Sequence, residues 1–208
     1  LAPQQFNPSF KVAGTPHWVA SMALPGHAQW QQFENNLTLD FGAERAAKWH
    51  ATMGEMKENA GFDIDDLTNW VGPELISFAD DAGNYVALRV RDRKALDAHL
   101  EDLTKRLHWR YRTEKLDGIE VHALVITHVS KSANTAKATA LNQLLARIGT
   151  HLYWVEDGDY LIFSKVPQAL ADRAAAHPDT SLANWLKSRD YEGEHTLAGI
   201  TAVTHDSE

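Results

Sequence analysis

Two stretches of the sequence, residues 72–107 and 149–176, carry the same order of features. Each begins with a glycine, runs through an apolar segment to an Asp/Gly turn, returns in a segment led by Tyr85 or Tyr160, and ends in a helix-like segment with an Ala-Leu pair. Turn residues between two apolar runs are typical of a β-hairpin. The pattern predicts two repeated hairpin-then-helix (ββα) units that share one core. Alternatively, two unrelated hairpins with Asp/Gly turns would look alike, but the matching glycine and Ala-Leu pair favour repetition.

The rest of the chain predicts a mixture of helices and strands. Asp117-Gly118 lies between two β-rich runs, which is the strongest short hairpin signal. Apolar residues recur at three- and four-residue steps over residues 27–39 and 46–60, as in amphipathic helices. A further helix is predicted over residues 138–148 and a last strand over residues 197–204. The fold class expected is α+β, with antiparallel or mixed sheets and packed helices.

The length of 208 residues predicts one domain with a core of its own. Residues 1–15, rich in Pro, Gln and Asn, are interpreted as an irregular N-terminal lead-in, and residues 16–208 as a single α+β domain. The chain is expected to be a fragment of a longer protein. A signal peptide or membrane anchor is expected upstream, because the first residue is Leu1 rather than Met.

Composition removes several function classes. The formal net charge is −8, whereas a nucleic-acid binder needs clustered Lys and Arg. Acids interrupt the nearest basic stripe, so no nucleic-acid partner is expected. The absence of cysteine excludes disulfides and thiolate chemistry, and weakly favours an exported protein of the periplasm or cell envelope. The longest apolar runs are too short to span a bilayer, so no membrane span is expected in this chain.

No pattern assigns catalytic, cofactor-binding or metal residues, and no cofactor is expected. The motifs G-x-S-x-G, G-x-G-x-x-G, the P-loop and H-E-x-x-H are missing. Two groups of acidic residues are dense enough to suggest an acid/base or metal site, but their positions at turns and helix starts favour structural roles. These groups are Asp63, Asp65 and Asp66, and Glu156, Asp157 and Asp159. His122 and His128 share one strand face about 20 Å apart, too far for one ion.

Tryptophan is abundant, with seven residues. Trp buries a large area but also serves binding faces, and burial is the favoured interpretation. Trp70 follows an acidic turn and precedes Val71-Gly72, where a predicted helix ends and the first predicted hairpin begins. We predict that Trp70 is largely buried and locks this junction. The alternative is an exposed aromatic used for binding.

Several segments together resemble a known family. These are Gly61-Phe62-Asp63-Ile64-Asp65-Asp66-Leu67, Trp70-Val71-Gly72-Pro73-Glu74, Asp92-Arg93-Lys94-Ala95-Leu96, Asp159-Tyr160-Leu161-Ile162-Phe163-Ser164, Pro167-Gln168-Ala169-Leu170 and Ser181-Leu182-Ala183. They resemble the glycine, acidic-turn, Trp-Leu-Gly signature and the repeated hairpin-helix units of an uncharacterised bacterial envelope protein family. Val71 departs from the family's usual leucine. The resemblance covers about residues 16 to 190 and implies location and architecture, but no activity and no catalytic residue.

These observations predict a non-enzymatic binding or interaction module of the bacterial envelope. A protein or an apolar ligand is the expected partner. The alternative is a hydrolase or metal-dependent enzyme whose site is assembled only in the tertiary structure. Bound zinc, or turnover abolished by one His or Asp substitution, would favour the enzyme.

Overall fold

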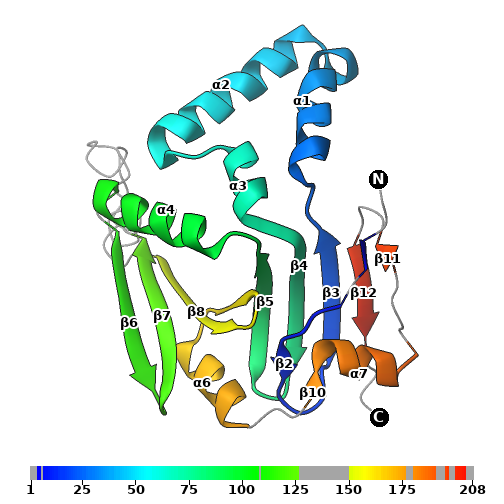
Figure 1. Cartoon of the computed structure of the whole chain (residues 1–208), viewed down its shortest axis with the longest axis vertical. Helices are drawn as coiled ribbons and strands as arrows, with labels where there is room; N and C mark the ends of the chain where they lie inside the picture. Colours follow the sequence, from blue (N-terminus) through cyan, green and yellow to red (C-terminus); the bar gives the residue numbers. More distant parts are fainter. Residues whose placement is uncertain are drawn as a thin grey trace, which may run out of the picture.

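The computed structural model describes residues 4–5, 7–107, 109–126, 150–176, 180–190, 195–196 and 200–204. Its main element is an antiparallel sheet with the strand order β12-β3-β4-β5-β9-β8-β7-β6 (Figure 1). The strands are β3 (Trp18–Ala23), β4 (Val71–Asp80), β5 (Gly83–Val90), β6 (Arg110–Leu116), β7 (Ile119–Ile126), β8 (Thr150–Asp157), β9 (Tyr160–Ser164) and β12 (Ile200–Thr204). Two short pairs join β1 (Gln4–Gln5) to β11 (His195–Thr196) and β2 (Lys11–Val12) to β10 (Thr180–Ser181).

Six described helices accompany the strands, which confirms the α+β class. They are α1 (His27–Phe41), α2 (Ala43–Ala60), α3 (Ile64–Trp70), α4 (Arg93–Arg106), α6 (Pro167–Ala175) and α7 (Leu182–Ser188). Figure 1 shows α1 and α2 extending beyond one end of the sheet, with α3 leading back into β4. We call α1, α2 and α3 the helical arm, and the sheet with α4, α6 and α7 the body. None of the described helices is long and apolar enough to cross a membrane.

Local signals fix the helix ends near the predicted positions. Gly61 ends α2 in the left-handed conformation, with φ of 75°, which glycine adopts without strain. The Asp63 side chain accepts the Asp66 amide, and Asp66 returns the contact to the Asp63 amide, closing a capping box at the start of α3. At α4 and α7 the cap is one-way: the Asp92 side chain accepts the amide of residue 95, and the Ser181 side chain accepts the amide of residue 184.

The two faces of the sheet have different covers, because successive side chains of a strand point to opposite faces. Ile162 belongs to the larger core cluster, which α6, α7 and the N-terminal segment complete through Leu170, Leu182 and Phe10. Leu161, the neighbouring residue, belongs to a smaller cluster on the other face, against which Leu96 of α4 packs. The body is therefore a sheet with helices on both faces.

The two predicted units are both hairpins followed by a helix, β4-β5-α4 and β8-β9-α6. Their second strands, β5 and β9, pair antiparallel at the centre of the sheet, an arrangement that a twofold axis normal to the sheet could relate. However, α4 and α6 pack on opposite faces, through Leu96 and Leu170. Such an axis preserves faces, so it cannot relate α4 to α6. That the units are copies of one ancestor stays a prediction.

The N-terminal segment is more than the lead-in that its composition predicts. Residues 7–16 have little regular structure, as expected, but their apolar side chains enter the core. Phe10 is fully buried, and Val12 and Ala13 are each 1% exposed. The Asp80 carboxylate accepts the Ala13 amide at 2.9 Å. The proline and glutamine content of the segment gives no sign that its apolar side chains belong to the main core. The domain limits at residues 15 and 16 stay a prediction.

Trp70 lies at the junction between arm and body. Its side chain is mostly, but not fully, buried, in agreement with the prediction. The ring packs 4.5 Å from the His99 ring of α4 and 5.8 Å from the Phe62 ring. Its carbonyl accepts the amides of Arg91 and Asp92. These contacts support the predicted junction role over an exposed binding aromatic. The helix predicted over residues 138–148 lies outside the described residues.

Candidate functional site

The helical arm is built differently from the body. Among the described side chains of α1 and α2, only Leu37 and Ala46 are buried. At the far end of the arm Leu39 is 83% exposed and Phe41 is 49% exposed. Apolar surface left in water in this way commonly marks contact sites. The arm is therefore the first place to look for function.

Aromatic side chains join α1 to α2. The ring of Trp30 lies 5.2 Å from that of Phe33 and 5.7 Å from that of Trp49. The Trp49 Nε1 atom donates to Glu34 Oε1 at 2.7 Å. A half-buried indole usually satisfies its N–H in this way, so the hydrogen bond orients both Trp49 and the Glu34 carboxylate. The arm is thus held by a narrow aromatic seam rather than by a wide core.

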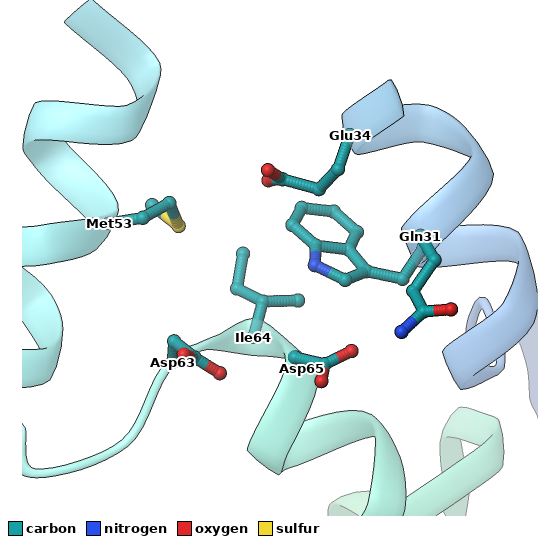
Figure 2. A pocket seen from close by; sticks show the side chains of 7 residues that line it. Gln31, Glu34, Met53, Asp63, Ile64 and Asp65 are labelled. Carbon is teal, nitrogen blue, oxygen red and sulfur yellow. The ribbon is translucent and has the colours of Figure 1, made fainter. Parts of the chain in front are cut away.

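A pocket opens beside this seam, where the three helices of the arm meet. Its volume is about 260 Å³. Figure 2 shows Glu34 and Gln31 on α1, Met53 on α2, and Asp63, Ile64 and Asp65 at the start of α3. Trp30 completes the lining. The wall thus combines apolar side chains with three carboxylates.

Asp63 is held by contacts on both of its oxygens. Oδ1 accepts the Asp66 amide at 2.9 Å, and Oδ2 accepts Lys57 Nζ at 2.7 Å. Burial by itself would raise the pKa of Asp63, but the hydrogen bonds from Lys57 and the Asp66 amide outweigh it and lower the pKa below its usual value. The carboxylate therefore stays ionised well into the acid range.

Histidines accompany the other two carboxylates. His27 Nδ1 lies 2.7 Å from Asp65 Oδ1, yet both atoms are buried without the alignment of a hydrogen bond. His50 Nδ1 lies 3.4 Å from Glu34 Oε2. These contacts tie α1 to α3 and α2 to α1, so all three helices meet through charged groups at the pocket.

A second polar cluster lies on the body, under the flank of α4. His122 is 8% exposed, and its ring centroid lies 6.0 Å from that of Tyr111 and 5.4 Å from that of Trp154. The Tyr111 and Trp154 centroids are 5.8 Å apart, so the three rings form a compact cluster. Tyr111 Oη contacts His122 Nδ1 at 2.6 Å, and Nε2 lies 3.4 Å from Glu156 Oε1. Burial lowers the pKa of His122, which favours the neutral imidazole.

This Tyr–His–Glu arrangement has the parts of an acid/base relay. Two contacts give it a structural interpretation as well. Arg93 of α4 forms an ion pair with Glu156, and the Trp154 ring packs on Phe163 at 5.8 Å. The histidine thus helps to bind α4 to the sheet.

The acidic groups singled out in the sequence do not form one acid/base pair. Asp63 caps α3 as predicted, and Asp65 joins it at the pocket. The three acids of the other group each form an ion pair with a different arginine: Glu156 with Arg93, Asp157 with Arg173, and Asp159 with Arg89. No group of three or more His, Asp or Glu side chains in the described ranges is arranged to hold a metal ion. His128 lies outside these ranges.

Sequence reasoning missed Trp30, Glu34 and Met53 as pocket residues. Trp30 and Glu34 are one helical turn apart on α1, which places them on one face, but the same spacing serves ordinary helix packing. Met53 comes from α2, and only the folded arm brings it to the pocket. Known proteins offer no guide here, since the chain matches no family model, no curated protein and no solved structure.

Proposed function

We propose that this chain is a non-enzymatic binding module of a bacterial envelope, and that its ligand occupies the pocket of the helical arm. The observation that carries the proposal is the pocket itself. It joins an apolar wall, with Trp30, Met53 and Ile64, to a few oriented polar groups. Such a combination is typical of sites that bind small ligands.

The polar groups of the pocket favour binding over catalysis. Asp63 is fixed by Lys57 and by a capping amide, and Glu34 is fixed by the Trp49 indole. A general base must be able to take up a proton near the working pH. Asp63 instead has a lowered pKa, which suits a permanent charge.

Shifts in the NMR signals of the arm on addition of a ligand test this proposal. The seven indole N–H signals of a ¹⁵N spectrum report on each tryptophan separately, and Trp30→Phe assigns the signal of Trp30. A set of small soluble compounds should contain members that shift the Trp30 signal. Ile64→Phe, which fills the pocket, should abolish these shifts. Val166→Phe, at a residue of the body that is 55% exposed, is the control and should preserve them. Shifts that persist in Ile64→Phe would contradict the pocket as the site.

Export to the envelope is the second part of the proposal. Its support is the chain's lack of cysteine and its resemblance to the envelope family. Cell fractionation of the natural gene product in a bacterial host checks it directly. Recovery of the mature protein with the cytoplasmic fraction would overturn the location and leave the pocket proposal standing.

One observation favours the alternative, a hydrolase. It is the 2.6 Å contact between Tyr111 Oη and His122 Nδ1, beside Glu156. A panel of esterase, phosphatase and peptidase substrates tests this alternative. Turnover that disappears in both Tyr111→Phe and His122→Gln, while the spectrum stays native, would favour the enzyme over the binding module.

A further inference from the structure

We propose that the pocket of the helical arm selects an organic cation, and specifically a methylated ammonium group. This inference rests on the proposed function, because it names the ligand class of the same pocket. It follows from three properties of the described residues: the aromatic and apolar wall, the local charge, and the state of the carboxylate oxygens.

The wall supplies the apolar contact that a methylated ammonium group needs. Trp30, Met53 and Ile64 line the pocket, and Trp is the side chain whose face attracts cations best. The pocket volume of about 260 Å³ is smaller than that of sites for drug-sized ligands. It suits a headgroup or a side-chain terminus rather than a large molecule.

The charge around the pocket is negative. Glu34, Asp63 and Asp65 line it, and Asp66 lies next to them in α3. Among the ion pairs of these four carboxylates, Lys57 brings the only permanent positive charge in the described part of the chain. The Lys57 side chain is itself 59% exposed, so solvent screens much of its charge. An anionic ligand would meet repulsion here, and a cation would restore neutrality.

The carboxylate oxygens and the apolar wall together determine which cation fits. Three of the six oxygens lining the pocket accept hydrogen bonds that hold the arm together: both oxygens of Asp63 and Oε1 of Glu34. A primary ammonium ion is compact and strongly hydrated, so it would lose water against the apolar side chains of Trp30, Met53 and Ile64. A methylated ammonium group carries the same charge with fewer donors or none. Such a group is therefore attracted by the negative charge of the carboxylates and by the aromatic wall, and its binding does not break the contacts that hold the arm.

Choline and its uncharged isostere 3,3-dimethylbutan-1-ol provide a matched pair of probes. Each is titrated against the ¹⁵N-labelled chain, and the indole signals of Trp30 and Trp49 are followed. Choline should shift them and bind about tenfold more tightly than the alcohol, the ratio that a charge over an aromatic face provides. Phosphocholine has the same ammonium group with a phosphate added. It should bind more weakly than choline, because the carboxylates repel it.

Two variants distinguish the effect of a charge in the pocket from the effect of the net charge of the chain. Asp65→Asn keeps the shape of the pocket but removes one charge, and should weaken choline binding about fivefold. Asp40→Asn makes the same change at an exposed residue near the end of α1, and should leave binding unchanged. Where Asp65→Asn disturbs the fold, salt gives the same information, because added NaCl should weaken the binding of choline and not of the alcohol.

The outcomes distinguish this inference from the proposed function. If the alcohol binds as tightly as choline at the Trp30 signal, the pocket is a binding site but does not select cations, and the inference is wrong. Phosphocholine binding as tightly as choline, or primary amines such as butylamine binding more tightly, would overturn it as well. If none of these probes or the compound set shifts the arm signals, the proposed function fails together with the inference.

Discussion

The body and the helical arm are stabilised in different ways. In the body, Phe78, Ile162 and Leu170 are fully buried in one continuous cluster. In the arm, α1 and α2 bury only Leu37 and Ala46 among their described side chains. They are joined by the aromatic seam and by the contact between His50 and Glu34. Burial of apolar surface provides most of the stability of a domain, whereas exposed ion pairs add little. The body therefore determines whether the protein folds, and the arm remains free to carry a site.

This difference also predicts where motion occurs. Segments with few buried contacts open at lower free-energy cost than the core does. The arm should open while the sheet remains closed, and the ligand pocket lies within the arm. Four predictions test this contrast, beginning with the largest expected effect.

Phe78→Ala should lower the free energy of unfolding by about 3–5 kcal/mol. The ring is fully buried and lies 5.0 Å from the rings of both Phe10 and Tyr85. Phe41→Ala makes the same change in the arm, where the ring is 49% exposed, and should cost less than about 1 kcal/mol. Urea denaturation followed by circular dichroism measures both. Equal losses in the two variants would show that arm and body share one core.

Trp70→Ala should cost about 2 kcal/mol, less than for a fully buried tryptophan, because the side chain is not fully buried. It would remove the contacts with Phe62 and His99 that join the arm to α4. Thermal melting measures the loss, and proteolysis locates it. We expect earlier cleavage within residues 27–70. A variant that melts like the parent would return Trp70 to the candidates for partner binding.

Acidification should destabilise the fold through His99 and His122. Burial lowers the pKa of both imidazoles, so the folded chain resists protonation that the unfolded chain accepts. Their contribution is present above the unfolded pKa of about 6.5 and is lost as the pH falls below it, by less than about 1.4 kcal/mol per pH unit for each group. Denaturation at pH 7.5 and pH 5.5 measures the change. His122→Gln should reduce this pH dependence, and an unchanged slope would contradict the assignment.

Trp49→Phe should have the smallest global effect. It keeps an aromatic ring but removes the donor to Glu34, a hydrogen bond contributing about 1 kcal/mol to the arm. Because the arm opens separately, the global free energy of unfolding should change by less than about 0.5 kcal/mol. Hydrogen exchange in α1 and α2 should become about fivefold faster. Equal acceleration in β4 and β9 would show that arm and body open as one unit.

Sequence signals predicted the elements well where the signal is local. Gly61 was the predicted end of α2, and the structure confirms it, because glycine readily adopts the left-handed conformation needed there. The acidic turn at Asp63 marked the start of α3, because the Asp63 side chain caps the first turn. The Asp117-Gly118 turn joins β6 to β7 as expected, with both residues at positive φ. Each of these signals acts within a few residues, so it can be read from neighbours in the sequence.

The candidate site could not be predicted in this way. Its lining residues come from three helices, and nothing in the spacing of Trp30 and Met53 indicates that they meet. The acidic turn at Asp63 and Asp65 was visible, but its sequence suggested a helix cap and gave no reason to expect a cavity beside it. The N-terminal segment shows the same limit, because Phe10 lacks a periodic pattern yet lies at the centre of the core.

Helix limits, hairpin turns and the alternation of apolar residues in the strands can all be inferred from the amino-acid order of this chain. These features depend on backbone geometry and on interactions between near neighbours. The pairing of β5 with β9, the positions of α4 and α6 on opposite faces, and the acidic, aromatic pocket in the arm become visible only in the folded chain. Those features depend on contacts between segments far apart in the chain, whose free energies are set by shape and burial rather than by sequence pattern.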